Sequence, residues 1–254
     1  MKLNIKAFAL TCGLIWVSTS LPAISAEEMT AEAIVRRSDD MLRGGESYCR
    51  MTMVVTRPEW SRTLTMDAWT QGTKNSLIHI LSPAKEKGVK FLKKGREAWQ
   101  HIPAINRTIK IPPSMMLQSW LGSDFTNDDV VRADSLITDY THEIISEPTE
   151  AGVDYWIVEA VAKPDAPVVW GKIVIKVRKE LFVADRADYY DEDGELIKYY
   201  ETSDIRDIEG RAVATHFVMH DITRPGYNTA LTYNRLTFSP MLKPDTFTKR
   251  NLER

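Results

Sequence analysis

The feature that most constrains the fold is an alternation of apolar and polar residues, with a period of two, through most of the chain. In residues 60–68, for example, Leu64 and Met66 share one face, while Thr63 and Thr65 share the other. This pattern is typical of β-strands with one buried face. The predicted strands are residues 46–56, 60–68, 75–81, 88–93, 98–102, 107–111, 140–146, 155–162, 170–178, 181–190, 196–204, 212–222 and 229–238.

Turn signals separate many of these strands, and few predicted helices intervene. Asp193-Gly194, Glu209-Gly210 and Pro225-Gly226 each mark a hairpin. Strands that follow one another in this way become antiparallel neighbours, and a sheet with this many strands curls. We therefore predict a mainly β protein, built as a strongly curved, incomplete antiparallel β-barrel. A helix at residues 31–42 precedes the strands, with Thr30 as its N-cap.

The N-terminus has the three parts of a secretory signal peptide. Lys2 and Lys6 precede an apolar run at residues 7–17, and small residues end at Ala26. We expect residues 1–26 to be removed, leaving residues 27–254 as a single domain exported across the inner membrane. The run is too short to form a transmembrane anchor.

Composition narrows the function classes. The chain has 33 Lys and Arg against 35 Asp and Glu, which argues against a nucleic-acid partner. Removal of the signal peptide would leave Cys49 without a disulfide partner, in the inward half of a strand, where we expect a small buried apolar side chain. We expect a monomer whose stability comes from its core.

One segment, residues 114–131, interrupts the alternation. Met116, Leu117, Trp120 and Leu121 recur at helical spacing before Gly122, which predicts a helix at residues 114–121 with one apolar face. That face covers either the core of the sheet or a cavity between helix and sheet, and a hydrophobic ligand would occupy such a cavity.

No motif in the sequence supports catalysis or a cofactor. Five histidines lack metal-ligand spacing, and no nucleophile elbow, phosphate loop or dinucleotide fingerprint occurs. We predict no enzyme activity, no cofactor and no metal. Asp124, Asp128 and Asp129 lack the pattern of a calcium loop and are interpreted as helix-capping groups beside Thr126. The basic stretch at residues 85–107 is either a solvated edge or a site for an anionic headgroup.

Three segments carry a resemblance to a known family. Residues 121–129 (LGSDFTNDD), residues 183–200 around DEDGEL, and residues 247–254 (FTKRNLER) resemble the outer-membrane lipoprotein-sorting protein family, a branch of the LolA-like superfamily. The resemblance covers most of residues 27–254. It implies a β half-barrel whose concave face is closed by helices around a cavity for acyl chains, and it implies a periplasmic location.

The function that the resemblance implies is that of a carrier. It would bind a lipid or a lipid-modified protein in a hydrophobic cavity and move it towards the outer membrane. The resemblance also implies an inner-membrane transporter of the RND/MMPL type as a partner. The alternatives are a periplasmic sensor or binding module that grips a partner protein with the same fold, and an uncharacterised hydrolase. The predicted cavity and lid residues are Met51, Met53, Leu64, Met66, Met115, Met116, Leu117, Trp120, Leu121 and Phe125.

Overall fold

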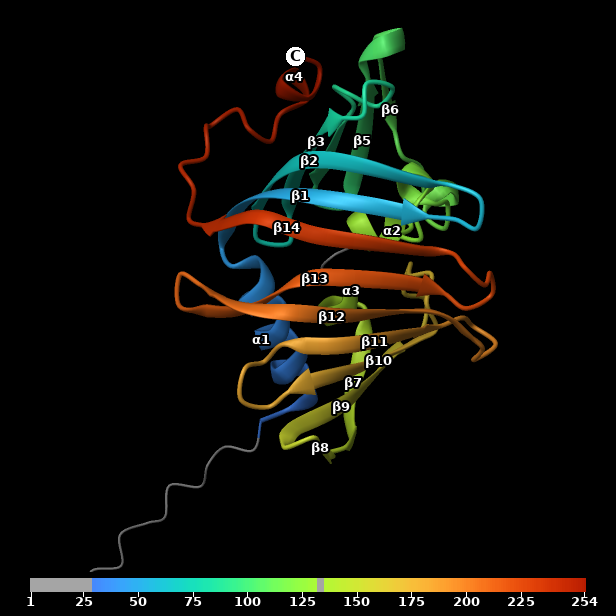
Figure 1. Cartoon of the computed structure of the whole chain (residues 1–254), viewed down its shortest axis with the longest axis vertical. Helices are drawn as coiled ribbons and strands as arrows, with labels where there is room; N and C mark the ends of the chain where they lie inside the picture. The colour runs from blue at the N-terminus through green and yellow to red at the C-terminus, as the bar shows by residue number, and fades with distance from the viewer. Residues whose placement is uncertain (1–28, 132–134) are drawn as a thin grey trace, which may run out of the picture.

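The computed structural model describes residues 29–131 and 135–254, and one large antiparallel sheet dominates it (Figure 1). The predicted signal peptide lies outside the described residues. The strands are β1 (Glu46–Thr56), β2 (Ser61–Gln71), β3 (Asn75–Ser82), β4 (Lys90–Lys94), β5 (Glu97–Ile102), β6 (Arg107–Lys110), β7 (Tyr140–Ser146), β8 (Thr149–Glu150), β9 (Val153–Ala162), β10 (Lys172–Arg178), β11 (Ala184–Tyr190), β12 (Leu196–Ile208), β13 (Arg211–Asp221) and β14 (Asn228–Phe238).

The strand order explains the open shape of the sheet. It runs β6-β5-β4-β3-β2-β1-β14-β13-β12-β11-β10-β9-β7, with β8 paired to β9 at the side. The first and last long strands pair in the middle, where Met53 lies opposite Leu231. The chain thus builds outwards from β1 to one edge, crosses to the other edge at β7, and returns. The predicted fold class, a curved and incomplete antiparallel barrel, is confirmed.

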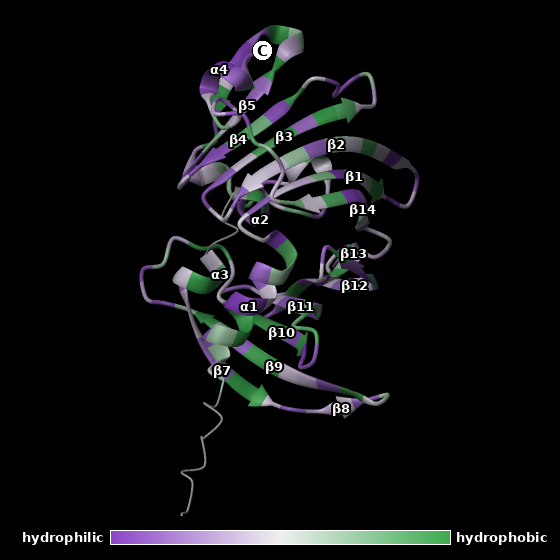
Figure 2. Cartoon of the chain, turned by 90° about the vertical axis from the view of Figure 1, so that its left-hand side faces the viewer, coloured by the Kyte–Doolittle hydropathy of each residue, from purple (hydrophilic) through white to green (hydrophobic). Residues whose placement is uncertain are grey.

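Helix α1 (Ala31–Arg43) lies on the concave side of the sheet (Figures 1 and 2). Thr30 is its N-cap, as predicted, because the hydroxyl accepts a 3.2 Å hydrogen bond from the backbone N–H of Ala33. Ile34 is fully buried and packs into a core cluster with Val158 and Val177. The helix ends at Gly44, whose φ of 61° suits glycine, and a Cβ there would lie 2.8 Å from the Phe238 ring.

The connection from β6 to β7 has to span the width of the sheet, because those two strands are its opposite edges. It carries two short 3₁₀ turns, η2 (Pro113–Met115) and η3 (Trp120–Gly122), and two short helices, α2 (Asn127–Val131) and α3 (Ser135–Thr138). Two further short elements lie elsewhere: η1 (Pro103–Ile105) after β5, and α4 (Lys249–Leu252) near the C-terminus.

The predicted helix at residues 114–121 is wrong. Ser119 has a non-helical ψ of 123° and forms a bridge with Thr126, and Leu121 has a left-handed φ of 53°. Helical spacing was present in the sequence, but a continuous helix could not make the bends that this crossing needs. The segment instead folds back on itself, and the backbone N–H of Trp120 donates to the backbone carbonyl of Phe125 at 2.8 Å.

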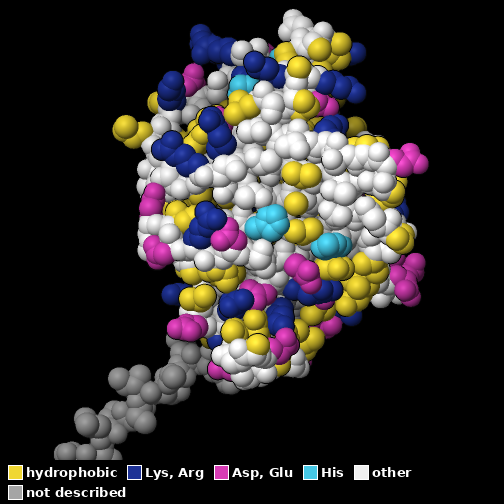
Figure 3. Space-filling model, viewed as in Figure 1, with side chains coloured by type: hydrophobic (Ala, Val, Ile, Leu, Met, Phe, Trp, Pro, Cys, Tyr) yellow, Lys and Arg dark blue, Asp and Glu magenta, His cyan; other side chains and the backbone are white. Residues whose placement is uncertain are grey.

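The outer face of the sheet shows no concentration of one kind of charge (Figure 3). Figure 3 shows the outer face of the sheet, where polar side chains and backbone predominate and charged groups of both signs are scattered. Within residues 29–131 and 135–254, every helix is too short or too polar to cross a lipid bilayer.

Candidate ligand-binding cavity

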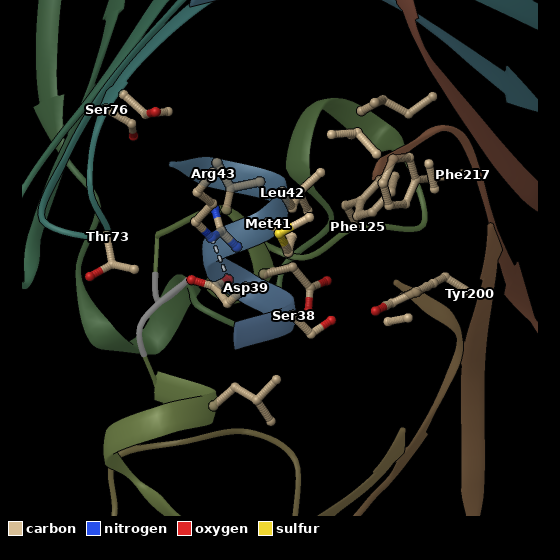
Figure 4. Close-up of a pocket in the computed structure, with 18 of the residues that line it drawn as sticks. Ser38, Asp39, Met41, Leu42, Arg43, Thr73, Ser76, Phe125, Tyr200 and Phe217 are labelled. Atoms are coloured by element: carbon tan, nitrogen blue, oxygen red, sulfur yellow. Dashed lines mark hydrogen bonds and ion pairs between the residues drawn. The ribbon is translucent and has the colours of Figure 1, made fainter. Parts of the chain in front are cut away.

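A cavity of about 380 Å³ lies between α1 and the concave face of the sheet (Figure 4). Met41, Leu42 and Arg43 of α1 form one wall, and strands from both halves of the sheet form the other. The β6–β7 crossing contributes Trp120 and Phe125. A volume of this size lies within the range of small-molecule sites, and most of the lining is apolar.

Aromatic side chains from the four successive strands β11 to β14 form a continuous ladder along the wall, and Trp170, just before β10, extends it. Trp170 lies 5.5 Å from Tyr189, Tyr189 lies 6.1 Å from Tyr200, Tyr200 lies 6.2 Å from Phe217, and Phe217 lies 5.8 Å from Tyr233, between ring centroids. All five rings line the cavity. Aromatic pairs of this kind stabilise one another by about 0.5–1.5 kcal/mol each, so we expect this wall to resist collapse when the cavity is empty.

The tyrosine hydroxyls in this ladder stay protonated. Burial raises the pKa of Tyr200 to about 12, with a further rise from the nearby Asp39 carboxylate. Burial likewise raises the pKa of Tyr189 and of Tyr233. Each hydroxyl is therefore available as a hydrogen-bond donor at neutral pH.

The wall that α1 contributes to the cavity also carries polar groups, namely Ser38 and one ion pair. The Arg43 Nε donates to Asp39 Oδ1 at 2.5 Å, one helical turn away, and Figure 4 shows the pair facing the cavity. Burial lowers the pKa of Arg43, but the Asp39 carboxylate raises it by more, so the net pKa is raised. The guanidinium keeps its charge inside the cavity.

Cys49 is buried in the cavity wall, as its place in the alternation predicted. Burial raises the pKa of this thiol to about 12. A thiol with this pKa forms roughly 1000-fold less thiolate at pH 8 than an ordinary cysteine does.

The raised pKa of the Cys49 thiol predicts very slow modification of this residue by a chromogenic disulfide reagent at pH 8. Because the raised pKa belongs to the folded state, the rate should increase by two to three orders of magnitude when the protein is unfolded in urea, as measured by release of the chromophore. Equal rates in buffer and urea would contradict a buried, protonated thiol.

A buried ion pair holds the crossing segment to the two central hairpins. The Arg57 Nη1 donates to Asp124 Oδ2 at 2.9 Å, and the two side chains are 6% and 1% exposed. The Thr229 hydroxyl donates to the same oxygen at 2.6 Å, and Arg57 Nη2 donates to the Gly122 carbonyl at 2.8 Å. Trp120 and Phe125, which flank this anchor, are thereby positioned over the cavity.

The predicted capping role is confirmed for one of the acidic residues that follow. The Thr126 N–H donates to Asp129 Oδ2 at 2.7 Å, and the Asp129 N–H donates to the Thr126 hydroxyl at 3.2 Å, which is a reciprocal capping arrangement at the start of α2. Lys198 Nζ also donates to Asp129 at 2.5 Å. Asp124 does not cap a helix but pairs with Arg57.

The structure brings nine of the ten sequence-predicted site residues into one apolar cluster. Three of the nine, Met51, Trp120 and Phe125, also line the cavity. The other six pack in the filled core beside it: Met53, Leu64, Met66, Met115, Met116 and Leu121. Leu117 lies outside the cluster with 63% of its surface exposed, because the helix that would have turned it inwards does not form.

The basic side chains of residues 85–107 do not lie together at one site. Lys93 is 4% exposed, lines the cavity and donates to the Thr73 carbonyl. Its neighbour Lys90 faces away from the cavity, towards α4, and donates to the Asn251 carbonyl at 3.0 Å. Arg107 is exposed on β6. One headgroup could not contact all three.

Sequence reasoning missed the aromatic ladder and Arg43. A signal for the ladder was available, because four consecutive strands each carry one inward aromatic residue, but it becomes visible only when the strand register is known. As for metals, no group of histidine, cysteine and acidic side chains suited to a metal ion occurs among the residues described.

The fold places the protein in a class already known from solved structures. A DUF1329 family protein from Desulfovibrio piger superposes with a TM-score of 0.81 at 24% identity, covering 87% of this chain and 97% of that one. A putative outer membrane lipoprotein-sorting protein domain from Vibrio parahaemolyticus gives a TM-score of 0.78 at 20% identity, covering 88% and 98%. A LolA superfamily protein from Nitrosomonas europaea gives 0.75 at 23% identity, covering 87% and 99%.

The sheet, the covering helix and the cavity between them thus define a LolA-like fold, as the sequence resemblance implied. The chain itself belongs to the family whose model, described as "Uncharacterized protein", matches residues 72–254. A search of curated proteins finds no match.

Proposed function

We propose that this protein is a periplasmic carrier that binds the acyl chain of a lipid, or of a lipid-modified protein, in the cavity between α1 and the sheet. The observation that carries the proposal is the cavity of about 380 Å³ with its aromatic ladder. The role is one of binding and not of catalysis.

The cavity suits an acyl chain for an energetic reason. Each methylene transferred from water to an apolar wall contributes about 0.8 kcal/mol, so a carrier needs a long apolar surface that remains open. Here Phe217, Leu231 and Met219 supply such a surface on one side, and Met41 and Leu42 of α1 supply it on the other. Methionine adapts to different tail shapes because its side chain is unbranched and flexible.

The remaining parts of the proposal concern location and partners. The N-terminal 26 residues have the form of a cleavable signal peptide, which supports export and a periplasmic site of action. On the basis of the family resemblance, we include in the proposal transport towards the outer membrane and receipt of cargo from an inner-membrane transporter of the RND/MMPL type.

Mass spectrometry of lipid extracted from natively purified protein tests the proposal. We expect acyl chains in near-stoichiometric amount, and we expect them to be lost after unfolding and refolding in lipid-free buffer, because the chains are held only by the folded cavity. A protein-binding module with the same fold would contain no lipid but would retain a partner protein. Lipid-free protein that also fails to take up added lipid would refute the carrier function.

A further inference from the structure

The polar groups of the cavity point to the chemistry of the ligand. Arg43, Tyr200 and Tyr233 all line it, and both tyrosines interact electrostatically with the guanidinium. They come from three elements far apart in sequence, namely α1, β12 and β14. Figure 4 shows Arg43 and Tyr200 on opposite sides of the open space.

The donors in this group are largely unused. Asp39 binds only the Nε of Arg43, so within residues 29–131 and 135–254 the two terminal nitrogens make no hydrogen bond. The hydroxyls of Tyr200 and Tyr233 likewise make none with a described residue, and their raised pKa keeps them protonated. A guanidinium cannot accept a hydrogen bond, so this set of groups needs acceptors from elsewhere.

A carboxylate or a phosphate supplies acceptors in the required form. The two terminal nitrogens of arginine present parallel N–H groups that match two oxygens of either anion, and such charge-assisted bonds are stronger in a cavity of low polarity. Asp39 supports this geometry because it holds the guanidinium by Nε and leaves the outer edge open. Most of the remaining lining is apolar and would hold a hydrocarbon tail.

We propose that Arg43, with Tyr200 and Tyr233, forms an anionic headgroup site, and that the ligand is an acyl-chain amphiphile with a carboxylate or phosphate head. The head binds the terminal nitrogens of Arg43, and the tail lies against Phe217 and the apolar wall. This rests on the proposed carrier function and adds to it the class of ligand and its orientation.

Titration of delipidated protein with three probes of one tail length tests whether the head of the ligand is anionic. The probes are dodecanoate and dodecyl phosphate, each below its micelle concentration, and dodecanol below its solubility limit. Acetate and inorganic phosphate serve as anions without tails. We expect both long-chain anions to bind at least about tenfold more tightly than dodecanol, since they alone make charge-assisted bonds. The better of the two anions identifies the head as carboxylate or phosphate. The anions without tails should bind at least about 100-fold more weakly, because they bury no methylenes.

Variants locate the site. Arg43→Gln should weaken binding of the preferred long-chain anion by about tenfold or more and change dodecanol binding by less than about twofold. Arg36→Gln is the matched control, because Arg36 is on the same helix but its side chain is 54% exposed and paired with Glu32. It should leave all affinities unchanged. Tyr200→Phe removes only a hydroxyl and should weaken the anion by a few-fold without affecting dodecanol, which provides a second test if Arg43→Gln folds poorly.

The outcomes separate this inference from the carrier function. If dodecanol binds as tightly as the anions, or if Arg43→Gln and Tyr200→Phe affect all long-chain probes equally, the headgroup site is wrong while the carrier function stands. If no long-chain probe binds, both fail. Tight binding of acetate or inorganic phosphate alone would show a small-anion site and would also overturn the proposal.

Discussion

Asp124→Ala should lower the free energy of unfolding by about 3–5 kcal/mol, which makes it one of the most destabilising single substitutions in the protein. The Arg57 guanidinium would remain buried, with 6% of its side chain exposed, but without its carboxylate partner. The Thr229 hydroxyl would lose its acceptor as well. For a chain of this size, such a loss corresponds to a decrease in melting temperature on the order of 10 °C.

Two further variants show whether the unpaired charge is the cause. In Arg57→Met/Asp124→Ala the guanidinium is absent, so the double variant should be more stable than Asp124→Ala alone. Glu97→Ala breaks the Lys110–Glu97 pair, whose side chains are 57% and 52% exposed, and should change stability by less than about 1 kcal/mol. Urea denaturation measures all three. If Asp124→Ala and Glu97→Ala were equally mild, the buried anchor would not stabilise the crossing segment.

The strands could be predicted from the sequence because their signal is local. A period of two requires only neighbouring residues, and β1 and β7 begin and end where the alternation does. The hairpins could be predicted equally well. Asp193-Gly194 connects β11 to β12, and Glu209-Gly210 connects β12 to β13. The open, curved sheet then followed from the number of strands and the few helices between them.

The crossing segment could not be predicted in the same way. Its apolar residues have helical spacing, but its course depends on a fact absent from the segment itself, namely that β6 and β7 are opposite edges of one sheet. Tertiary contacts decide the backbone: Arg57 binds the Gly122 carbonyl, and Arg62 binds the Leu121 carbonyl. Partners 59 and 65 residues away in sequence leave no local pattern.

The candidate site was predicted in the correct region but with an incorrect division between core and cavity. Met53, Leu64 and Met66 alternate in the same way as Met51, and no local feature of the sequence shows that they pack in a filled core while Met51 borders open space. Arg43 was ambiguous for a similar reason. At the end of α1 it could have interacted with solvent or with the helix terminus, and its position in the cavity follows only from how the helix lies across the sheet.

Ala68→Phe should abolish most ligand binding while leaving the protein folded. Ala68 lies in β2, opposite Cys49, and lines the cavity. A phenyl ring at this position would occupy space that the acyl chain needs, so we expect at least about tenfold less lipid per protein by mass spectrometry, a loss of roughly 1.4 kcal/mol or more in binding. The ring would enter space that is already open, so the effect on stability should not exceed the 1–3 kcal/mol typical of overpacking.

Thr63→Phe is the matched control for this substitution. Thr63 is exposed on the opposite face of the same strand, so the same ring added there does not enter the cavity. It should retain lipid at the level of the parent protein. If Ala68→Phe also retained lipid, the ligand would bind elsewhere. If it unfolded, the residues around Ala68 would form a closed core and not an open cavity. Loss of lipid in a stable Ala68→Phe protein, beside a loaded Thr63→Phe protein, is the result that only a ligand-filled cavity produces.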